Sequence, residues 1–421
     1  MTNKQNWRRS ATCRIAVGAL PLGLLFTSAV MGAFAQQKST YTFTVLHRFK
    51  GGADGANPYA GVILDSEGNL YGTTVNGGAS GLGVVFKVDK AGHETVLHAF
   101  SGRPDGANPY GALVLDTAGN LYGTTNIGGN GAFGAGDGTV FEVDTTGTET
   151  VLHGFTNLAG EGAFPVAGLT LDSAGNFLGT TECGGKWNVG AVFQMSATGT
   201  EEPLFTFDKS DGLYPWAGVT LDPAGYIYGT TSGTNPSLCS SRTGKGVVFE
   251  LDPATRTETV LHSFTGGADG QWPYGALAQD SAGNLYGTAS AGGSTPGSTG
   301  YGVVYQLDTT GTQSVLYTFT GGADGATPWA GPYLDAKGKL YGTTFYGGAA
   351  QGPAGYGLVY QVDASSGETV LYTFTGGADG ANPYAGLVED SAGNLYGTTY
   401  YGGIAAGSAG YGVVFKLTPQ D

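Results

Sequence analysis

The stretch that decides the fold is residues 370–399, VLYTFTGGADGANPYAGLVEDSAGNLYGTT. Short runs of β-branched and aromatic residues alternate in it with glycine, aspartate, asparagine and proline. Such runs are typical of short β-strands, and the residues between them favour tight turns. Copies of this stretch recur along the chain at intervals of 51 to 57 residues. They begin at Val45, Val96, Val151, Pro203, Val260, Val315 and Val370.

Each copy contains four predicted strands, which in the first copy are residues 45–49, 61–65, 70–74 and 83–89. Four strands per repeat of this length, without helical periodicity, are typical of a β-propeller blade. We therefore predict an all-β, seven-bladed β-propeller with four-stranded blades, built as a single domain over residues 36–421.

The composition agrees with this fold class. The chain has 78 glycines among 421 residues, and 12% of its residues are aromatic. That aromatic content argues against disorder, and the glycines do not recur every third residue as in collagen. Each glycine in a helix interior costs about 1 kcal/mol, so long helices are not expected.

The two ends of the repeat region predict how the ring closes. The region opens with a lone outer strand, residues 41–49, and it ends with three strands of a last blade. We predict that the opening strand pairs beside residues 413–415, which closes the ring and hides a sheet edge. An open solenoid is the alternative, and it would need atypical capping repeats.

The repeat resembles the GloVer tandem repeat, or choice-of-anchor tandem repeat, of bacterial exported proteins. Residues 370–380 and 390–399 carry the resemblance, which covers nearly all of the chain after residue 35. It implies a bacterial, exported repeat protein and assigns no catalytic residues. Copy three departs from the pattern at Glu161, and copy four departs at Pro203 and Tyr226. No anchor segment is expected after the last copy, which leaves surface attachment open.

Residues 1–35 have the pattern of a cleaved secretory signal peptide. Four basic residues precede an apolar run over residues 15–31, and the small-x-small pattern AFA follows at 33–35. We expect a periplasmic or extracellular protein with no membrane segment after removal of the signal. Without those four residues the charge is 14 − 33 = −19, against −15 for the whole chain, which disfavours nucleic acid as a partner.

An acidic residue recurs after the first strand of every copy, and it has two interpretations. The seven side chains could ring the channel mouth and bind Ca²⁺, the one cofactor candidate, because this ion prefers oxygen ligands. Alternatively, each could cap its own turn, and the repetition favours this interpretation. The residues are Asp54, Asp105, Glu161, Asp211, Asp269, Asp324 and Asp379.

Two groups of aromatic residues are candidates for binding sugar rings. The first follows the recurring proline and is Tyr59, Tyr110, Trp216, Tyr274, Trp329 and Tyr384, with Val166 at this position in copy three. Packing in wedges between blades is the favoured interpretation for this group. The second lies in the glycine-rich loops of the last three copies, with Tyr301, Tyr356 and Tyr411 at loop ends and Tyr346, Tyr400 and Tyr401 at loop starts.

Histidines and cysteines complete the candidates. Four histidines, His47, His98, His153 and His262, share one repeat position, which Phe205, Tyr317 and Tyr372 occupy elsewhere. Since phenylalanine cannot bind a metal, we predict packed aromatic rings there. Cys183 and Cys239 fall in loops of neighbouring copies on one predicted face, which would allow a disulfide.

These patterns favour an exported binding or interaction module. The expected ligand is carbohydrate or another cell-envelope or extracellular polymer. The alternatives are a metal-assisted hydrolase or lactonase-like enzyme at the channel mouth and a purely structural surface protein. A metal enzyme needs an asymmetric ligand set, whereas a multivalent binder tolerates near-identical loops.

Overall fold

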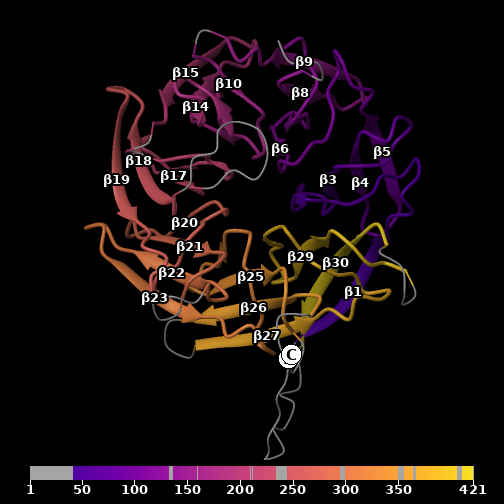
Figure 1. The fold of residues 1–421 in the computed structure, drawn as a ribbon. Coiled ribbons are helices and arrows are strands. Elements are labelled where there is room, and N and C mark those ends of the chain that lie inside the picture. The colour runs from indigo at the N-terminus through magenta and orange to yellow at the C-terminus, as the bar shows by residue number, and fades with distance from the viewer. Residues whose placement is uncertain are drawn as a thin grey trace, which may run out of the picture. The chain divides into compact units, whose positions relative to one another are not determined.

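The computed structural model describes residues 41–420 except 132–135, 159, 209, 211, 234–243, 294–298, 349–354, 364–366 and 405–409. Residues 39–421 form one compact unit, and the predicted signal peptide lies outside the described residues. Within the described ranges every regular element is a β-strand. Seven antiparallel four-stranded sheets form the blades of a β-propeller (Figure 1), so the predicted fold class is confirmed.

The first three blades follow the repeat order, from a short inner strand to a long outer strand. Blade one has β2 (Ile63–Leu64), β3 (Leu70–Thr74), β4 (Val84–Val88) and β5 (Glu94–Ala99). Blade two has β6 (Val114–Leu115), β7 (Leu121–Thr125), β8 (Thr139–Val143) and β9 (Glu149–Gly154). Blade three has β11 (Thr170–Leu171), β12 (Phe177–Thr181), β14 (Ala191–Met195) and β15 (Glu201–Thr206), and a separate pair joins β10 (Gly162–Ala163) to β13 (Cys183–Gly184).

The remaining four blades have the same order. Blade four has β16 (Thr220–Leu221), β17 (Ile227–Thr231), β18 (Val247–Asp252) and β19 (Thr257–Ser263). Blade five has β20 (Ala278–Gln279), β21 (Leu285–Ala289), β22 (Val303–Leu307) and β23 (Gln313–Thr318). Blade six has β24 (Tyr333–Leu334), β25 (Leu340–Thr344), β26 (Leu358–Asp363) and β27 (Gly367–Thr373). Blade seven has β28 (Val388–Glu389), β29 (Leu395–Thr399), β30 (Val413–Pro419) and β1 (Tyr41–Arg48).

The N-terminal strand completes the last blade, as the sequence predicts. Strand β1 pairs antiparallel with β30, with Val45 opposite Phe415, and Figure 1 shows the indigo strand beside the yellow one. At the same junction the Thr398 hydroxyl donates to the Ala60 carbonyl at 2.9 Å. The ring is therefore closed by hydrogen bonds between residues from opposite ends of the chain.

The recurring Gly-Thr-Thr sequence of the second strand explains how blades join. A Cβ at Gly72 would lie 2.7 Å from the Phe86 ring, so only glycine lets the third strand pack there. The first threonine bonds to the next blade and the second bonds back to its own loop, as Thr74 does to the Asn76 carbonyl at 2.8 Å. The bonds to the next blade come from Thr73, Thr124, Thr180, Thr230, Thr288, Thr343 and Thr398.

The hairpin turns and the third strands supply the rest of the local stability. In the first hairpin Asp65 Oδ1 accepts the Asn69 backbone N–H at 2.8 Å, which fixes the predicted tight turn. The third strand lies between its neighbours in the sheet, and the side chains of Val84, Val85 and Phe86 are fully buried. None of the described residues belongs to a helix long and apolar enough to cross a membrane.

Candidate functional site

The side chains that follow the seven prolines meet at the centre of the ring. They line two adjoining cavities of about 350 and 360 Å³. We term them the collar: Tyr59, Tyr110, Val166, Trp216, Tyr274, Trp329 and Tyr384. The sequence favours a packing role for these residues, and the rings do pack on those of neighbouring blades, as Tyr59 does on Tyr384, but they do so around the axis. Each inner strand is only two residues long, and the residues just before it, such as Ala60 and Gly61, already face the axial channel.

The collar is an almost continuous ring of aromatic contacts. Tyr274 and Trp329 stack with their centroids 4.3 Å apart, and Tyr59 and Tyr384 stack at 4.5 Å. Trp329 also contacts Tyr384 at 5.6 Å. Burial raises the pKa of Tyr59 far above its ordinary value, so its hydroxyl stays neutral. The collar therefore presents flat, uncharged rings to any molecule on the axis.

One of the two cavities opens among the loops, and we term it the loop-face chamber. Besides the collar, its lining includes Asn126, Glu182, Tyr400 and Tyr401. All four follow second strands, so the loops after these strands and the proline segments line the same chamber. Tyr400 contacts Tyr384 at 5.2 Å and Tyr401 at 4.6 Å, which extends the aromatic surface outward on that side.

Glu182 gives the chamber one acidic wall. Its side chain is 4% exposed, and its Oε1 is buried without a hydrogen-bond partner. Burial raises the pKa of this carboxyl to about 7. The backbone holds it firmly, because the Glu182 N–H donates to the Phe164 carbonyl at 3.1 Å and the β10–β13 pair begins at the next residue.

Sequence reasoning missed Glu182, although a signal for it was present. It occupies the position directly after the Gly-Thr-Thr sequence of the second strand. The other copies have Val75, Asn126, Ser232, Ser290, Phe345 and Tyr400 at this position. An acid that occurs in only one of seven otherwise similar copies has no role in the repeat itself, which makes it a candidate for a specific site.

The cysteine beside Glu182 anchors this loop further. Cys183 is 1% exposed and is disulfide-bonded. Cys239, its predicted partner, lies outside the described residues, so the pairing between the two stays a prediction. In either case the covalent bond at Cys183 restrains the loop that positions the acidic wall.

The loop-end tyrosines lie apart from the chamber. Tyr301, Tyr356 and Tyr411 are 39%, 47% and 44% exposed, and none lines either axial cavity. Each ring lies on a glycine of the connection to the next blade, and these glycines are Gly321, Gly376 and Gly51. Each ring therefore packs on a glycine with part of its surface, and the rest of the ring is exposed to solvent. Tyr346 is also exposed, at 44%.

The recurring acidic residues cap their own turns, and the expected ring at the channel mouth is corrected. Asp105 Oδ2 accepts the Ser101 backbone N–H at 2.7 Å. The same bond joins Asp54 to Lys50, Glu161 to Thr156, Asp269 to Thr265, Asp324 to Thr320 and Asp379 to Thr375. The turn directly follows the outermost strand, so none of these six lines an axial cavity. Asp211 lies outside the described residues.

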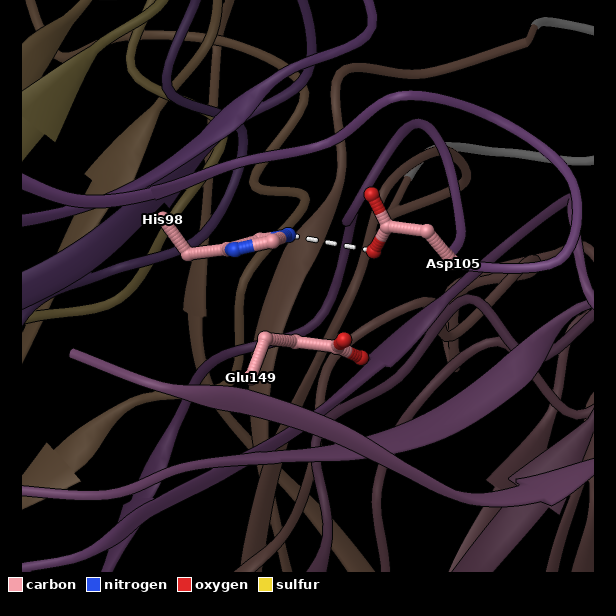
Figure 2. A group of neighbouring side chains, drawn as sticks. All are labelled: His98, Asp105 and Glu149. Atoms are coloured by element: carbon pink, nitrogen blue, oxygen red, sulfur yellow. Dashed lines mark hydrogen bonds and ion pairs between the residues drawn. The ribbon is translucent and has the colours of Figure 1, made fainter.

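The histidines meet these acids at the outer strands. Figure 2 shows His98 Nε2 facing Asp105 Oδ1 at 3.0 Å, with Glu149 from β9 of the next blade beside them. The three offer ligand atoms within 4.8 Å of one another, as do His153, Glu161 and Glu201. We term these two groups the rim clusters. The His98 ring also packs edge-on against Phe100 at 4.9 Å, so it has the packing role that the sequence predicts.

In other blades different residues stand at the position of Glu149, yet they still contact the outer strand of the preceding blade or the turn after it. This indicates that the position serves to connect neighbouring outer strands. Gln313 stands where Glu149 stands in blade two, and its amide donates to the Asp269 carbonyl at 2.8 Å. In blade seven this position is Phe43, which stacks on Tyr372 with centroids 3.9 Å apart. Polar and aromatic pairs thus make the same contact between neighbouring outer strands.

The glutamate of a rim cluster predicts a pH dependence of stability. Burial and then the nearby Asp105 carboxylate raise the pKa of Glu149 to about 7, above its ordinary value of 4.5. The folded state then holds this proton between pH 4.5 and 7 while the unfolded state releases it, so stability falls as pH rises through this window. We expect Glu149→Gln to stabilise the protein by about 1 kcal/mol at pH 8, after allowance for the group's partial exposure, and little at pH 4.5.

Urea denaturation at the two pH values measures this difference. Glu67→Gln, on an exposed hairpin turn, is the matched control for the substitution itself. An equal effect of Glu149→Gln at pH 4.5 and pH 8 would contradict the assignment.

Comparison with known proteins supports the repeat and the fold. A family model described as the Gloeobacter/Verrucomicrobia repeat matches residues 28–241 and 238–421. No curated protein matches the sequence. Among solved structures, the extracellular domain of a B. thetaiotaomicron protein named as a hybrid two-component system is 11% identical over 89% of this chain, with a TM-score of 0.53. This chain spans 39% of that protein, and the likeness supports the propeller fold alone.

Two enzymes are more distant in structure. A GH74 enzyme from Niastella koreensis is 18% identical over 79% of this chain and 47% of its own, with a TM-score of 0.49. A gluconolactonase from Xanthomonas campestris is 15% identical over 72% of this chain and 82% of its own, with a TM-score of 0.44. Neither likeness is close enough to carry an argument about chemistry.

Proposed function

The chain belongs to the Gloeobacter/Verrucomicrobia repeat family, and we propose that it is an exported binding β-propeller that recognises carbohydrate through the loop-face chamber. Another extracellular polymer whose rings stack on aromatic side chains would also suit the loop-face chamber. The observation that carries the proposal is the collar, in which six of seven repeat positions bring an aromatic ring to one axial cavity.

The chemistry of the chamber suits a sugar. The apolar face of a sugar ring packs on flat aromatic rings, and its hydroxyls need polar partners at the edge. Trp329 and Tyr274 supply the flat surface, and Asn126 and Glu182 supply polar groups in the same lining. The cavity of about 360 Å³ lies within the common range for small-ligand sites.

The described lining favours binding over hydrolysis. Glycoside hydrolysis usually needs two carboxylates that flank one bond, and a catalytic metal needs several ligands. Among the described residues that line the loop-face chamber, Glu182 is the one carboxylate and histidine is absent. The metal-assisted or lactonase-like alternative therefore has little support from this site. A purely structural protein would have no ligand at the axis.

Calorimetric titration of the purified protein with a panel of neutral oligosaccharides tests the proposal. We expect at least one of them to bind with one site per chain, because seven blades form a single axial chamber. Several equivalent sites per chain would indicate the separate blade loops instead. Absence of binding by every oligosaccharide in the panel would contradict carbohydrate recognition.

A further inference from the structure

We propose that the loop-face chamber selects saccharides that carry a protonated amino group, and that Glu182 is the specificity-determining residue that pairs with this group. The inference rests on the proposed function and names the substrate class for the same site. The chemical class is a hexosamine unit with a free amine within an oligosaccharide.

The first support is the state of the Glu182 carboxyl. A buried carboxylate without partners is unfavourable, since it has lost water and gained no hydrogen bond. One oxygen of Glu182 is in this state, because Oε1 is buried and unpartnered in a side chain that lines the chamber. An ammonium group has three donors and a full positive charge, so it would satisfy the carboxylate better than a neutral hydroxyl would.

The second support is that no cation of the protein competes for this position. The described residues that line the chamber include no lysine, arginine or histidine. The buried Asp137, in the loop between β7 and β8, is not in this lining. Glu182 therefore carries the only formal charge among the described lining residues.

The third support is the aromatic surface that surrounds the acid. A cation near the face of a tryptophan or tyrosine ring is attracted by the electrons of the ring. Burial and then the nearby Glu182 carboxylate raise the pKa of Tyr110. The collar continues from Tyr110 to Tyr59, whose rings meet at 5.0 Å. An amine paired with Glu182 would therefore also meet ring faces.

The fourth support is rigidity. The Glu182 loop is held by the bond to Phe164, by the β10–β13 pair and by the disulfide at Cys183. A carboxylate held in place in the free protein loses little further freedom on binding, so its contribution to selectivity is large. The same backbone pairing recurs in other blades, for example between Ala107 and Ile127, so the acidic side chain of Glu182, and not the backbone arrangement, distinguishes blade three.

The test compares three ligands of equal length at pH 7, where a sugar amine and the Glu182 carboxyl are both partly ionised: an oligosaccharide of hexosamine units, its N-acetylated form and its neutral hexose form. We expect the wild-type protein to bind the amino form about tenfold more tightly than either neutral form. Glu182→Gln should remove this preference, so that the variant binds the three forms with affinities within about twofold of one another. Equal affinities for all three in the wild-type protein would overturn the inference.

A second variant tests whether charge, and not shape, causes the preference. Asn126 lines the same chamber one blade away, so Asn126→Asp in the Glu182→Gln background returns one carboxylate to the wall. We expect this double variant to recover part of the preference for the amino form. Glu182→Gln protein that still prefers the amino form by tenfold would overturn the assignment of Glu182.

The pH dependence of the preference for the amino form distinguishes charge pairing by Glu182 from a merely structural role, which would not change the preference with pH. The pKa of Glu182 is raised to about 7, so the carboxyl is mostly protonated at pH 5 and the preference should disappear there. A preference that is unchanged between pH 5 and pH 7 would contradict the pairing.

The outcomes separate this inference from the proposed function. If the hexose form binds and the amino form is not preferred, only the inference fails. If no oligosaccharide binds, the proposed function fails as well. A simple alkylamine that competes as strongly as the amino oligosaccharide would assign the chamber to small cations and overturn the saccharide class.

Discussion

Replacing Gly412 with alanine should lower the free energy of unfolding by about 3 kcal/mol or more. Gly412 has φ +93°, and a Cβ there would lie 2.2 Å from the Thr399 carbonyl oxygen and 2.7 Å from Cδ of Pro58. The neighbours are a backbone atom and a rigid ring, so neither can yield cheaply. The strained conformation costs about 1 to 2 kcal/mol, and the steric overlap costs about 1 to 3 kcal/mol more.

The contact matters because Pro58 and Gly412 come from opposite ends of the repeat region and meet where the ring closes. Gly81→Ala is the matched control, since Gly81 also has positive φ (+75°) but no atom within 4 Å of the added Cβ. Guanidinium denaturation of both variants gives the comparison. Similar losses for the two would mean that the contact with Pro58 and Thr399 contributes nothing to stability.

Trp329→Ala should weaken carbohydrate binding by more than tenfold. Trp329 stacks on Tyr274, contacts Tyr384 and lines both axial cavities. Removal of a central aromatic residue from a binding site commonly costs about 2 kcal/mol or more, which exceeds the 1.4 kcal/mol of a tenfold change. Titration calorimetry with the tightest oligosaccharide of the panel measures the loss, and Trp329→Phe should retain most of the affinity.

Trp187→Ala is the control for this variant. Trp187 is 47% exposed, lies in the loop between β13 and β14, and does not line either axial cavity. Its removal should leave the affinity unchanged. A large loss with Trp187→Ala and none with Trp329→Ala would move the binding site from the axis to the outer loops.

The fold could be predicted from the sequence because the determinants are local and repeated. Turn residues such as Asp65 act within a few positions, and seven copies of one pattern leave few arrangements that bury every strand. The closure of the ring was also predictable, since the lone strand at residues 41–49 needs a partner and the last blade ends with a strand at residues 413–415 that lacks an outer neighbour.

The candidate site was less predictable because it depends on distances across the ring. The residues after the prolines look alike whether they fill wedges or face the axis, and the length of the inner strand decides between these arrangements. For the recurring acidic residues after the first strands, the local role was easier to predict than the position in the fold. Their turn-capping role is local and was favoured from repetition, whereas their expected position at the channel mouth needed the three-dimensional path of the turn.

Departures from the repeat proved more informative about the site than the repeat itself. Glu182 replaces neutral residues of the other copies, and Cys183 follows it directly. Single deviations carry no periodic signal, so a search for shared motifs passes over them. Their meaning emerged only when the chamber placed Glu182 beside the collar.

A crystal structure of the protein with the tightest oligosaccharide tests the central claim most directly. The account predicts one bound chain in the loop-face chamber, with a sugar ring on Trp329 and a polar substituent within hydrogen-bond distance of the Glu182 carboxyl. An oligosaccharide bound instead at Tyr301, Tyr356 or Tyr411, with the collar unoccupied, would contradict it.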